Sequence, residues 1–384
     1  MAKIIYLSQM KLSEKLKRDW FIDDFLENNV SIEFWDVSEI IHHSESSNID
    51  IDNIKIKEFN SIRSLEGSLK QAYAMNACFI ITIPRYYEAL KIYRLLAKYN
   101  IFTVFFLWGE SPNILRQGNN YMKLIKYLGI HKNIFTSLIR LMKRIVTKLH
   151  IKLGLIKKYD ICFFAGDMCR QYNSGKVMYP INLCDYEQAM ISDDNSIIND
   201  DYAVFIDINL PYNIDVDIEG LKKVDVNKYY SELNNFFDRF EKSYKIKVVI
   251  AGHPNSDYDK SVFGNREVVK LKTSTLIKHS SHVLLHYSTA ISYAIIYYKP
   301  ITFFVSSEMN RGYDYKMSKL LSTYLERPFI NLHKNENLLH NYPINKKLYD
   351  KYKYNYIVSS ETESRKSFPI IFQHIKNNYP RLDS

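Results

Sequence analysis

Glycine and proline are scarce in this chain, with 11 and 10 residues among 384. A sequence poor in both is neither collagen-like nor a low-complexity, disordered chain. Hydrophobic residues make up 46% and charged residues 24% of the chain, which is typical of a soluble globular protein. Because the chain is longer than one hydrophobic core supports, we expect two domains of about 150 to 200 residues each.

Cysteine is also rare, and no two cysteines have the spacing of a metal-binding pair. The four are Cys78, Cys162, Cys169 and Cys184. The absence of Cys-x-x-Cys pairs argues against structural zinc, and this cysteine usage fits a reducing compartment. We therefore expect a cytoplasmic protein.

Long apolar runs are missing as well. No stretch approaches the roughly 18 uninterrupted apolar residues that a membrane-spanning helix needs. The segment Met1–Ser8 predicts a strand, and it lacks the apolar core and the cleavage site of a signal peptide. Any contact with a membrane is therefore expected to be peripheral.

Acidic residues are absent between Glu110 and Asp160, and this basic stretch accounts for the net charge of +10. Within the basic segment 119–158, apolar residues recur at helical spacing while basic residues take the opposite side. The apolar positions are Ile134, Leu138, Leu141, Ile145, Leu149 and Leu153, and the basic ones include Arg140, Lys143, Arg144 and Lys148.

Two interpretations of this amphipathic helix remain open. A basic amphipathic helix is suited to bind an anionic membrane surface. An ordinary surface helix has the same pattern, with its apolar face on the core and its basic face in water. Nucleic acid is a poorer partner, because no recognised binding motif accompanies the charge.

Apolar strands alternate with helical segments along most of the chain, which predicts a doubly wound α/β fold. Strands are expected at 3–7, 31–36, 54–59, 78–83, 101–107, 159–164, 202–207, 248–252, 267–271, 283–286, 301–305 and 329–332. Helices are expected at 14–27, 64–76, 86–99, 227–244, 275–279, 290–298 and 364–378. The first domain is predicted over 1–190 and the second over 200–360, with a polar, acidic linker at 192–201.

Two strands of the second domain end in residues that suit an anionic ligand. The first continues into Gly252-His253-Pro254 and the second into Tyr287-Ser288-Thr289. Ligands of open parallel sheets bind outside the carboxyl ends of the strands, so both motifs would face one crevice if their strands are neighbours.

Each motif offers hydrogen-bond donors to a phosphate. Ser288 and Thr289 precede an apolar helical run, and a helix N-terminus presents free N–H groups and hydroxyls to an anion. His253 donates a hydrogen bond and, when protonated, adds a positive charge. Taken singly, Ser288 has a plainer role as a helix cap and His253 as the end of a strand; their joint occurrence favours a phosphate site.

These motifs resemble the His-Pro motif and the later Ser/Thr motif of bacterial sialyltransferases and related transferases that use CMP-activated sugars. Phe205–Pro211, the His-Pro segment and Lys299-Pro300 also look like the surface-polysaccharide glycosyltransferases of the GT-B fold. The similarity covers mainly residues 200–310.

The resemblance implies two Rossmann-like domains facing a central cleft, with the acceptor domain first, the nucleotide-sugar donor domain second, and a helix at 361–384 that crosses back. It favours a CMP-nonulosonate, a sialic-acid-like sugar, as donor and a lipid-linked oligosaccharide of an O-antigen or capsule as acceptor. The transfer is expected to be inverting. The enzyme would act in the cytoplasm, peripheral to the inner membrane.

An inverting transfer needs a base for the acceptor hydroxyl. Asp207 ends the first strand of the second domain and is similar in position to the acidic motif that precedes the His-Pro motif in the sialyltransferase-like enzymes. It departs from their paired acidic residues followed by glycine. The alternative is that Asp207 accepts backbone N–H bonds in a turn. Glu110, after the strand 101–107, is the reserve candidate, although a turn carboxylate facing water is the plainer interpretation.

Neither a metal nor an organic cofactor is expected. Asp50-Ile-Asp52 and Asp215-Val-Asp217 match an Asp-x-Asp pattern that is common by chance, and neither pair lies cleanly at a strand end. The histidines at 42, 43, 279, 282 and 286 are interpreted as structural. Ser8-Gln9, after the first strand, lacks the glycine fingerprint of a nicotinamide or flavin site.

Three other functions remain open. The same fold serves UDP- and GDP-sugar transferases, in which a carboxylate typically contacts the nucleotide ribose; the segment after His253 offers no obvious glutamate for this. A nucleotide-sugar 2-epimerase shares the architecture but acts on a soluble substrate. A binding subunit of a polysaccharide assembly complex would bind no nucleotide.

Overall fold

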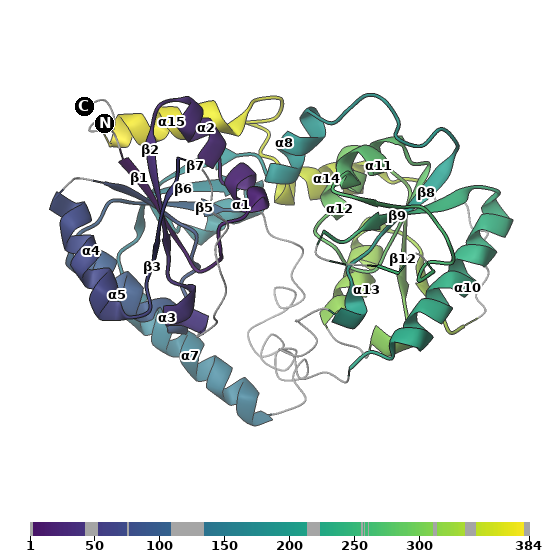
Figure 1. Ribbon diagram of the computed structural model, residues 1–384, viewed down its shortest axis with the longest axis horizontal. Helices are drawn as coiled ribbons and strands as arrows, with labels where there is room; N and C mark the ends of the chain where they lie inside the picture. Colours follow the sequence, from purple (N-terminus) through teal and green to yellow (C-terminus); the bar gives the residue numbers. More distant parts are fainter. Residues whose placement is uncertain are drawn as a thin grey trace. The chain divides into compact units, whose positions relative to one another are not determined.

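The computed structural model describes residues 3–42, 53–74, 77–108, 134–212, 223–254, 256, 258–259, 261–309, 313–334 and 343–379. This part of the chain forms two compact units (Figure 1). Among the described residues, the first unit comprises those up to 182 together with those from 359 onward, and the second comprises those from 183 to 358. No helix in the described ranges is both long enough and apolar enough to span a membrane.

The first unit is built on a seven-stranded sheet in which all pairings are parallel. Its strands are β1 (Lys3–Ser8), β2 (Ser31–Asp36), β3 (Lys55–Glu58), β4 (Cys78–Ile81), β5 (Thr103–Leu107), β6 (Tyr159–Ala165) and β7 (Gly175–Ile181). Their spatial order is β3-β2-β1-β4-β5-β6-β7. Its helices include α1 (Glu14–Asp19), α2 (Ile22–Glu27), α3 (Ser38–His42), α4 (Ile62–Ala74), α5 (Leu90–Lys98), α7 (Ile134–Lys152) and α15 (Ser367–Asn378).

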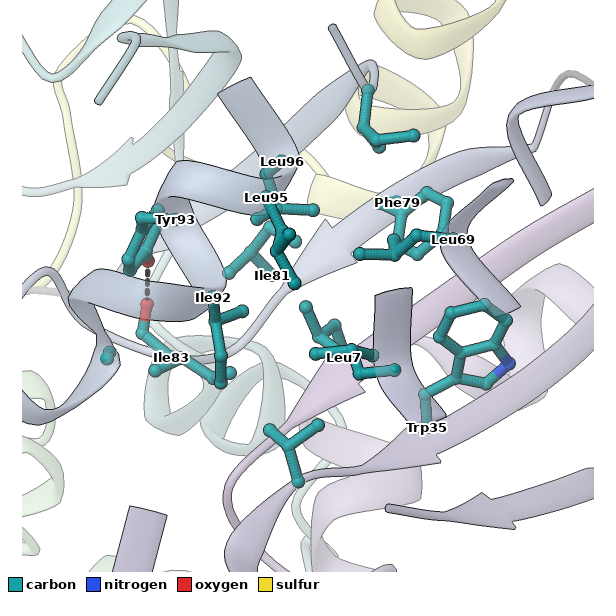
Figure 2. Close-up of a cluster of buried hydrophobic side chains, with 14 of the residues drawn as sticks. Leu7, Trp35, Leu69, Phe79, Ile81, Ile83, Ile92, Tyr93, Leu95 and Leu96 are labelled. Carbon is teal, nitrogen blue, oxygen red and sulfur yellow. Dashed lines mark hydrogen bonds between the residues drawn. The ribbon is translucent and has the colours of Figure 1, made fainter. Parts of the chain in front are cut away.

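Hydrophobic clusters cover both faces of this sheet, because alternate side chains of each strand point to opposite sides. Figure 2 shows one cluster, in which Leu7, Phe79 and Ile81 of the strands meet Leu69 of α4 and Ile92 of α5. On the other face, Phe25 of α2 packs against Phe368 and Phe372 of α15. A sheet buried on both faces is typical of a parallel α/β domain.

The second unit has a six-stranded sheet, again with parallel pairings only. Its strands are β8 (Tyr202–Ile206), β9 (Lys247–Gly252), β10 (Val268–Lys270), β11 (His282–Leu285), β12 (Ile301–Val305) and β13 (Phe329–Asn331). The described helices are α8 (Cys184–Met190), α10 (Val226–Tyr244), α11 (Thr273–His279), α12 (Ile291–Ile296), α13 (Tyr313–Leu325) and α14 (Lys346–Tyr356). The order is β10-β9-β8-β11-β12-β13.

In both sheets the first strand lies inside, the next two extend to one edge, and the chain then returns to build the other side. This is the strand order of a doubly wound Rossmann-like domain. The predicted α/β class with two such domains, the pair that the GT-B fold combines, is therefore confirmed.

The boundary between the units differs from the prediction. The chain divides after Asn182, whereas the linker was expected at 192–201. Helix α8 belongs to the second unit because it packs on α11 and α12, and Tyr297 of the segment after α12 donates a hydrogen bond of 3.1 Å to the carbonyl of Ala189. The predicted linker thus lies within the second unit.

Residues 359–379 return to the first unit and are fixed there by a buried amide. The side chain of Asn182 donates to the carbonyls of Thr362 (3.2 Å) and Arg365 (2.6 Å). Its oxygen accepts a hydrogen bond of 2.8 Å from the Thr362 hydroxyl, and its backbone N–H donates to Ser367 Oγ at 2.9 Å. These bonds place α15 against the first sheet.

Candidate functional site

The two predicted motifs and Asp207 follow adjacent strands. Strand β8 lies between β9 and β11, so Asp207, His253 and Ser288 come after three neighbouring parallel strands. Their backbones are locked in register, because the N–H of Asp207 donates to the carbonyl of Ala251 at 3.1 Å. The strand order reverses between β8 and β11, which is where ligands of such sheets bind. The structure therefore gathers these residues at one edge of the second sheet.

Asp207 is a buried carboxylate with one oxygen bonded and one not. Its side chain is 4% exposed. Oδ2 accepts hydrogen bonds from the N–H of Asn209 (3.0 Å) and from the hydroxyl of Tyr258. Oδ1 is buried and has no hydrogen-bond partner among the described residues. Burial raises the pKa of Asp207, and the hydrogen bonds from Tyr258 and Asn209 oppose this shift only in part.

Tyr258 joins the ends of β8 and β9. Its hydroxyl donates to Asp207 and accepts a hydrogen bond of 3.0 Å from the N–H of His253. Its ring lies over the end of β9, where a Cβ on residue 252 would come 3.2 Å from Tyr258 Cε2 and 2.9 Å from Val268 Cγ1. Glycine at position 252 therefore lets the ring approach the strand. Burial also raises the pKa of Tyr258, so its hydroxyl keeps its proton.

The predicted helix cap at Ser288 is wrong in detail. Helix α12 begins at Ile291, and the first three amides of its opening turn donate to the carbonyls of Ser288, Thr289 and Ala290 at 3.1–3.2 Å. These tight turns use the N–H groups that were expected to be free for an anion. The hydroxyl of Ser288 accepts from the N–H of Ala290 at 3.3 Å and keeps its own hydrogen to donate.

The other predicted donor-site residues differ in exposure. Pro254 and Thr289 are exposed, whereas His253, Tyr287 and Ser288 are half-buried. Residues after both β9 and β11 thus have accessible surface, whereas Asp207, which directly follows β8, is buried.

His282 begins β11 and His286 directly follows it, and both rings lie within hydrogen-bonding distance of neighbouring residues. His286 is fully buried, with Nδ1 2.8 Å from the carbonyl of Phe304 and Nε2 3.0 Å from the hydroxyl of Tyr229. His282 Nε2 lies 2.8 Å from Thr302 Oγ1. Burial lowers the pKa of both rings to about 4, so both are neutral near pH 7. No group of three potential metal ligands occurs within the described ranges.

A polar cluster at the end of β12 was not predicted. Glu232 of α10 accepts hydrogen bonds from Ser306 Oγ (2.7 Å) and from the N–H and hydroxyl of Ser307. Glu308, 7% exposed, forms an ion pair of 2.7 Å with Lys228. The signal was present, because Ser306-Ser307-Glu308 follows a predicted strand just as His253 does.

Several predicted positions lie outside the described residues. These are Glu110, the reserve base, together with Asp50, Asp52, Asp215, Asp217 and His43. The side chain of Arg140 is likewise not described.

The remaining predicted basic positions, Lys143, Arg144 and Lys148, lie on α7 in the first unit. The interpretation of α7 as an ordinary surface helix, with its apolar face packed on the core, is wrong. Leu138, Ile145 and Leu149 are each about half exposed, at 51%, 48% and 48%. The core is contacted instead through a side of α7 that includes Thr147, which is buried. Lys143 forms an ion pair of 2.6 Å with Glu88.

The chain matches no protein-family model, and no curated protein sequence is similar to it. Solved structures with a similar fold include the UDP-GlcNAc 2-epimerase from Methanocaldococcus jannaschii, which has a TM-score of 0.49. It is 12% identical in sequence, and the match covers 98% of this chain and 99% of that chain. The glycosyltransferase SnogD from Streptomyces nogalater has 8% identity over 98% and 99%, with a TM-score of 0.48. The calicheamicin glycosyltransferase CalG4 has 10% identity over 86% and 85%, with a TM-score of 0.47. Similarities at this distance do not define a reaction for this chain.

Proposed function

We propose that this chain is a glycosyltransferase that moves a sugar from a nucleotide-sugar donor to a lipid-linked surface-polysaccharide acceptor. The supporting observation is the edge formed by β9, β8 and β11. There, a buried carboxylate with an unbonded oxygen follows β8, and β8 lies between the two strands that precede His253 and Ser288. A CMP-nonulosonate is the favoured donor because of the resemblance of the two motifs. The favoured location is the cytoplasmic face of an inner membrane, where lipid-linked acceptors lie.

In this proposal Asp207 is the base. Its carboxylate takes the proton of the acceptor hydroxyl while the acceptor oxygen forms a bond to the anomeric carbon of the donor. The bond from that carbon to the donor phosphate breaks, and the phosphate leaves with the electron pair as part of the nucleotide. A carboxylate whose pKa is raised by burial is a stronger base than one in water, which suits it to this role.

The leaving phosphate is stabilised by hydrogen-bond donors of the second unit. His253 and the hydroxyls of Ser288 and Thr289 supply these donors. Hydrogen-bond donors placed in this way stabilise the negative charge that develops on a leaving group. Gly252, Pro254 and Tyr287 shape the same edge. No metal has a role in this proposal, and Glu110 stays the reserve base.

A nucleotide screen by thermal unfolding tests the proposal. A ligand that binds only the folded chain raises its melting temperature by mass action. CMP is expected to raise it more than UDP or GDP, and His253→Ala with Ser288→Ala is expected to remove the increase. His279→Ala, a histidine away from the site, serves as the matched control and keeps the increase. A chain that no nucleotide stabilises would be a binding subunit, and a preference for UDP would favour a UDP-sugar transferase or 2-epimerase.

A further inference from the structure

Helix α7 lies at the outside of the first unit (Figure 1) and contacts the segment Tyr87–Ala89. Thr147 is buried, Val146 packs against the core cluster of the sheet, and Lys143 lies 5.5 Å from the ring of Tyr87 as well as beside Glu88. These positions are three and four residues apart, so they lie on one side of the helix. In the described part of the chain, side chains on other sides of α7 are exposed.

An apolar stripe runs along one of those open sides. It consists of Leu138, Met142, Ile145, Leu149 and Leu153, whose exposed fractions are 51%, 59%, 48%, 48% and 70%. Steps of four, three, four and four residues place them along one line of the helix and its end. Large side chains exposed singly are normal in proteins, but a contiguous row of five marks an interaction surface.

A basic stripe lies beside the apolar stripe. Arg144, Lys148 and Lys152 are exposed and follow one another at steps of four residues. No acidic residue occurs in α7. The surface therefore combines aliphatic side chains with positive charge alone.

We propose that α7 docks on an anionic membrane surface, with the apolar stripe entering the boundary between headgroups and acyl chains and the basic stripe facing lipid phosphates. The charge of the surface selects this occupant. A second copy of α7 would bring like charges together, and residues 111–133 of the chain contain no acidic residue that could pair with the basic stripe. This surface concerns the proposed location and does not depend on the proposed reaction.

Both stripes contribute to the affinity for such a membrane. Replacing Ile145 and Leu149 by serine is expected to lower partitioning onto vesicles of phosphatidylglycerol and phosphatidylcholine about tenfold per side chain, because each loses an apolar contact with lipid. Replacing Lys148 and Lys152 by glutamine is expected to lower it roughly fivefold per charge. The charge variant should differ little from wild type on phosphatidylcholine alone.

Two controls keep the measurement specific. Lys143→Gln removes a charge of α7 that pairs with Glu88, and it should leave binding almost unchanged. Ile191→Ser with Leu271→Ser removes two exposed apolar side chains of the second unit and should also leave it unchanged. Unaltered melting temperatures show that the variants fold, since the replaced side chains are exposed.

Cosedimentation with vesicles, done without donor or acceptor, separates this surface from catalysis. Wild-type protein that stays in solution, or an Ile145/Leu149 variant that binds as wild type does, would overturn the proposal. If the wild type is a dimer that does not bind vesicles and the Ile145/Leu149 variant is a monomer, the apolar stripe is the interface with a second copy instead. If the wild type binds vesicles but transfers no sugar in a separate assay with donor and acceptor, the result counts against the proposed reaction alone.

Discussion

At the scale of single residues, the second unit is organised around a carboxylate that the fold makes more basic. Asp207 is removed from water at the end of a central strand, and one of its oxygens is held by Tyr258 and Asn209 while the other has no described partner. Oδ2 accepts the hydrogen bond that fixes the turn at Asn209, as the plainer interpretation expects. The role of Asp207 as a base is a proposal that the following variant tests.

Asp207→Asn separates the two roles. Because asparagine keeps the shape and one acceptor oxygen but cannot take the proton, we expect nearly normal donor binding and a turnover lowered about 10²–10⁴-fold. Steady-state kinetics at saturating donor and acceptor, together with calorimetric donor binding, measure both quantities.

Tyr258→Phe is the matched variant for this prediction. It removes the hydrogen bond to Asp207 and leaves the carboxylate in place, so turnover should fall less than in the asparagine variant. Full turnover by Asp207→Asn would exclude Asp207 as the base. A large drop in melting temperature with loss of donor binding would make its role structural.

At the scale of elements, most strands were predictable, but β7 (Gly175–Ile181) and several helices were not. Strands β1, β8 and β12 are buried on both faces and therefore appear as largely apolar runs. The helix predicted at 14–27 is two helices, because Phe21 takes a left-handed conformation (φ 57°) and packs its ring on Trp108 and Phe106. No local pattern reveals such a tertiary contact.

The site was predictable only in part for the same reason. Residues that directly follow a strand, such as His253 and Asp207, can be found from the strand itself. Tyr258 lies six residues beyond the end of β9, and only the folded chain brings its hydroxyl to Asp207. In a chain with 31 tyrosines, nothing in the sequence singles it out.

A pair of glycine variants tests the packing of β9. Gly252→Ala is expected to destabilise the protein by about 1–3 kcal/mol, because its Cβ would be forced against Val268 and the ring of Tyr258. Gly67→Ala, on helix α4 with no atom within 4 Å of the added Cβ, should instead stabilise it by about 0.5–1 kcal/mol. Urea unfolding measures both. Equal effects of the two substitutions would show that Tyr258 does not press on β9.

At the scale of the whole molecule, burial of His282 and His286 makes the second unit sensitive to acid. Their pKa values are about 4 in the folded chain, against about 6.5 for an unfolded histidine. Between these values the unfolded chain binds protons that the folded chain does not. Stability should therefore fall as the pH is lowered from about 6.5 to 4, by about 1.4 kcal/mol per pH unit for each ring.

His282→Gln isolates one ring, since glutamine does not titrate. Asp207, whose pKa is raised, acts in the opposite sense in both proteins and cancels from their difference. We expect the free energy of unfolding of the wild type to fall relative to that of the variant as the pH falls. Urea unfolding and hydrogen exchange of β11 and β12 measure this difference. A difference independent of pH would contradict the assignment of a neutral, buried His282.

The first unit takes described residues from both sides of 183–358, so it cannot be complete until the last segment of the chain has been made. Without α15, Phe25 lacks the ring of Phe368, which lies 5.1 Å away in the finished fold. A chain truncated after residue 358 would therefore leave apolar side chains on one face of the first sheet uncovered.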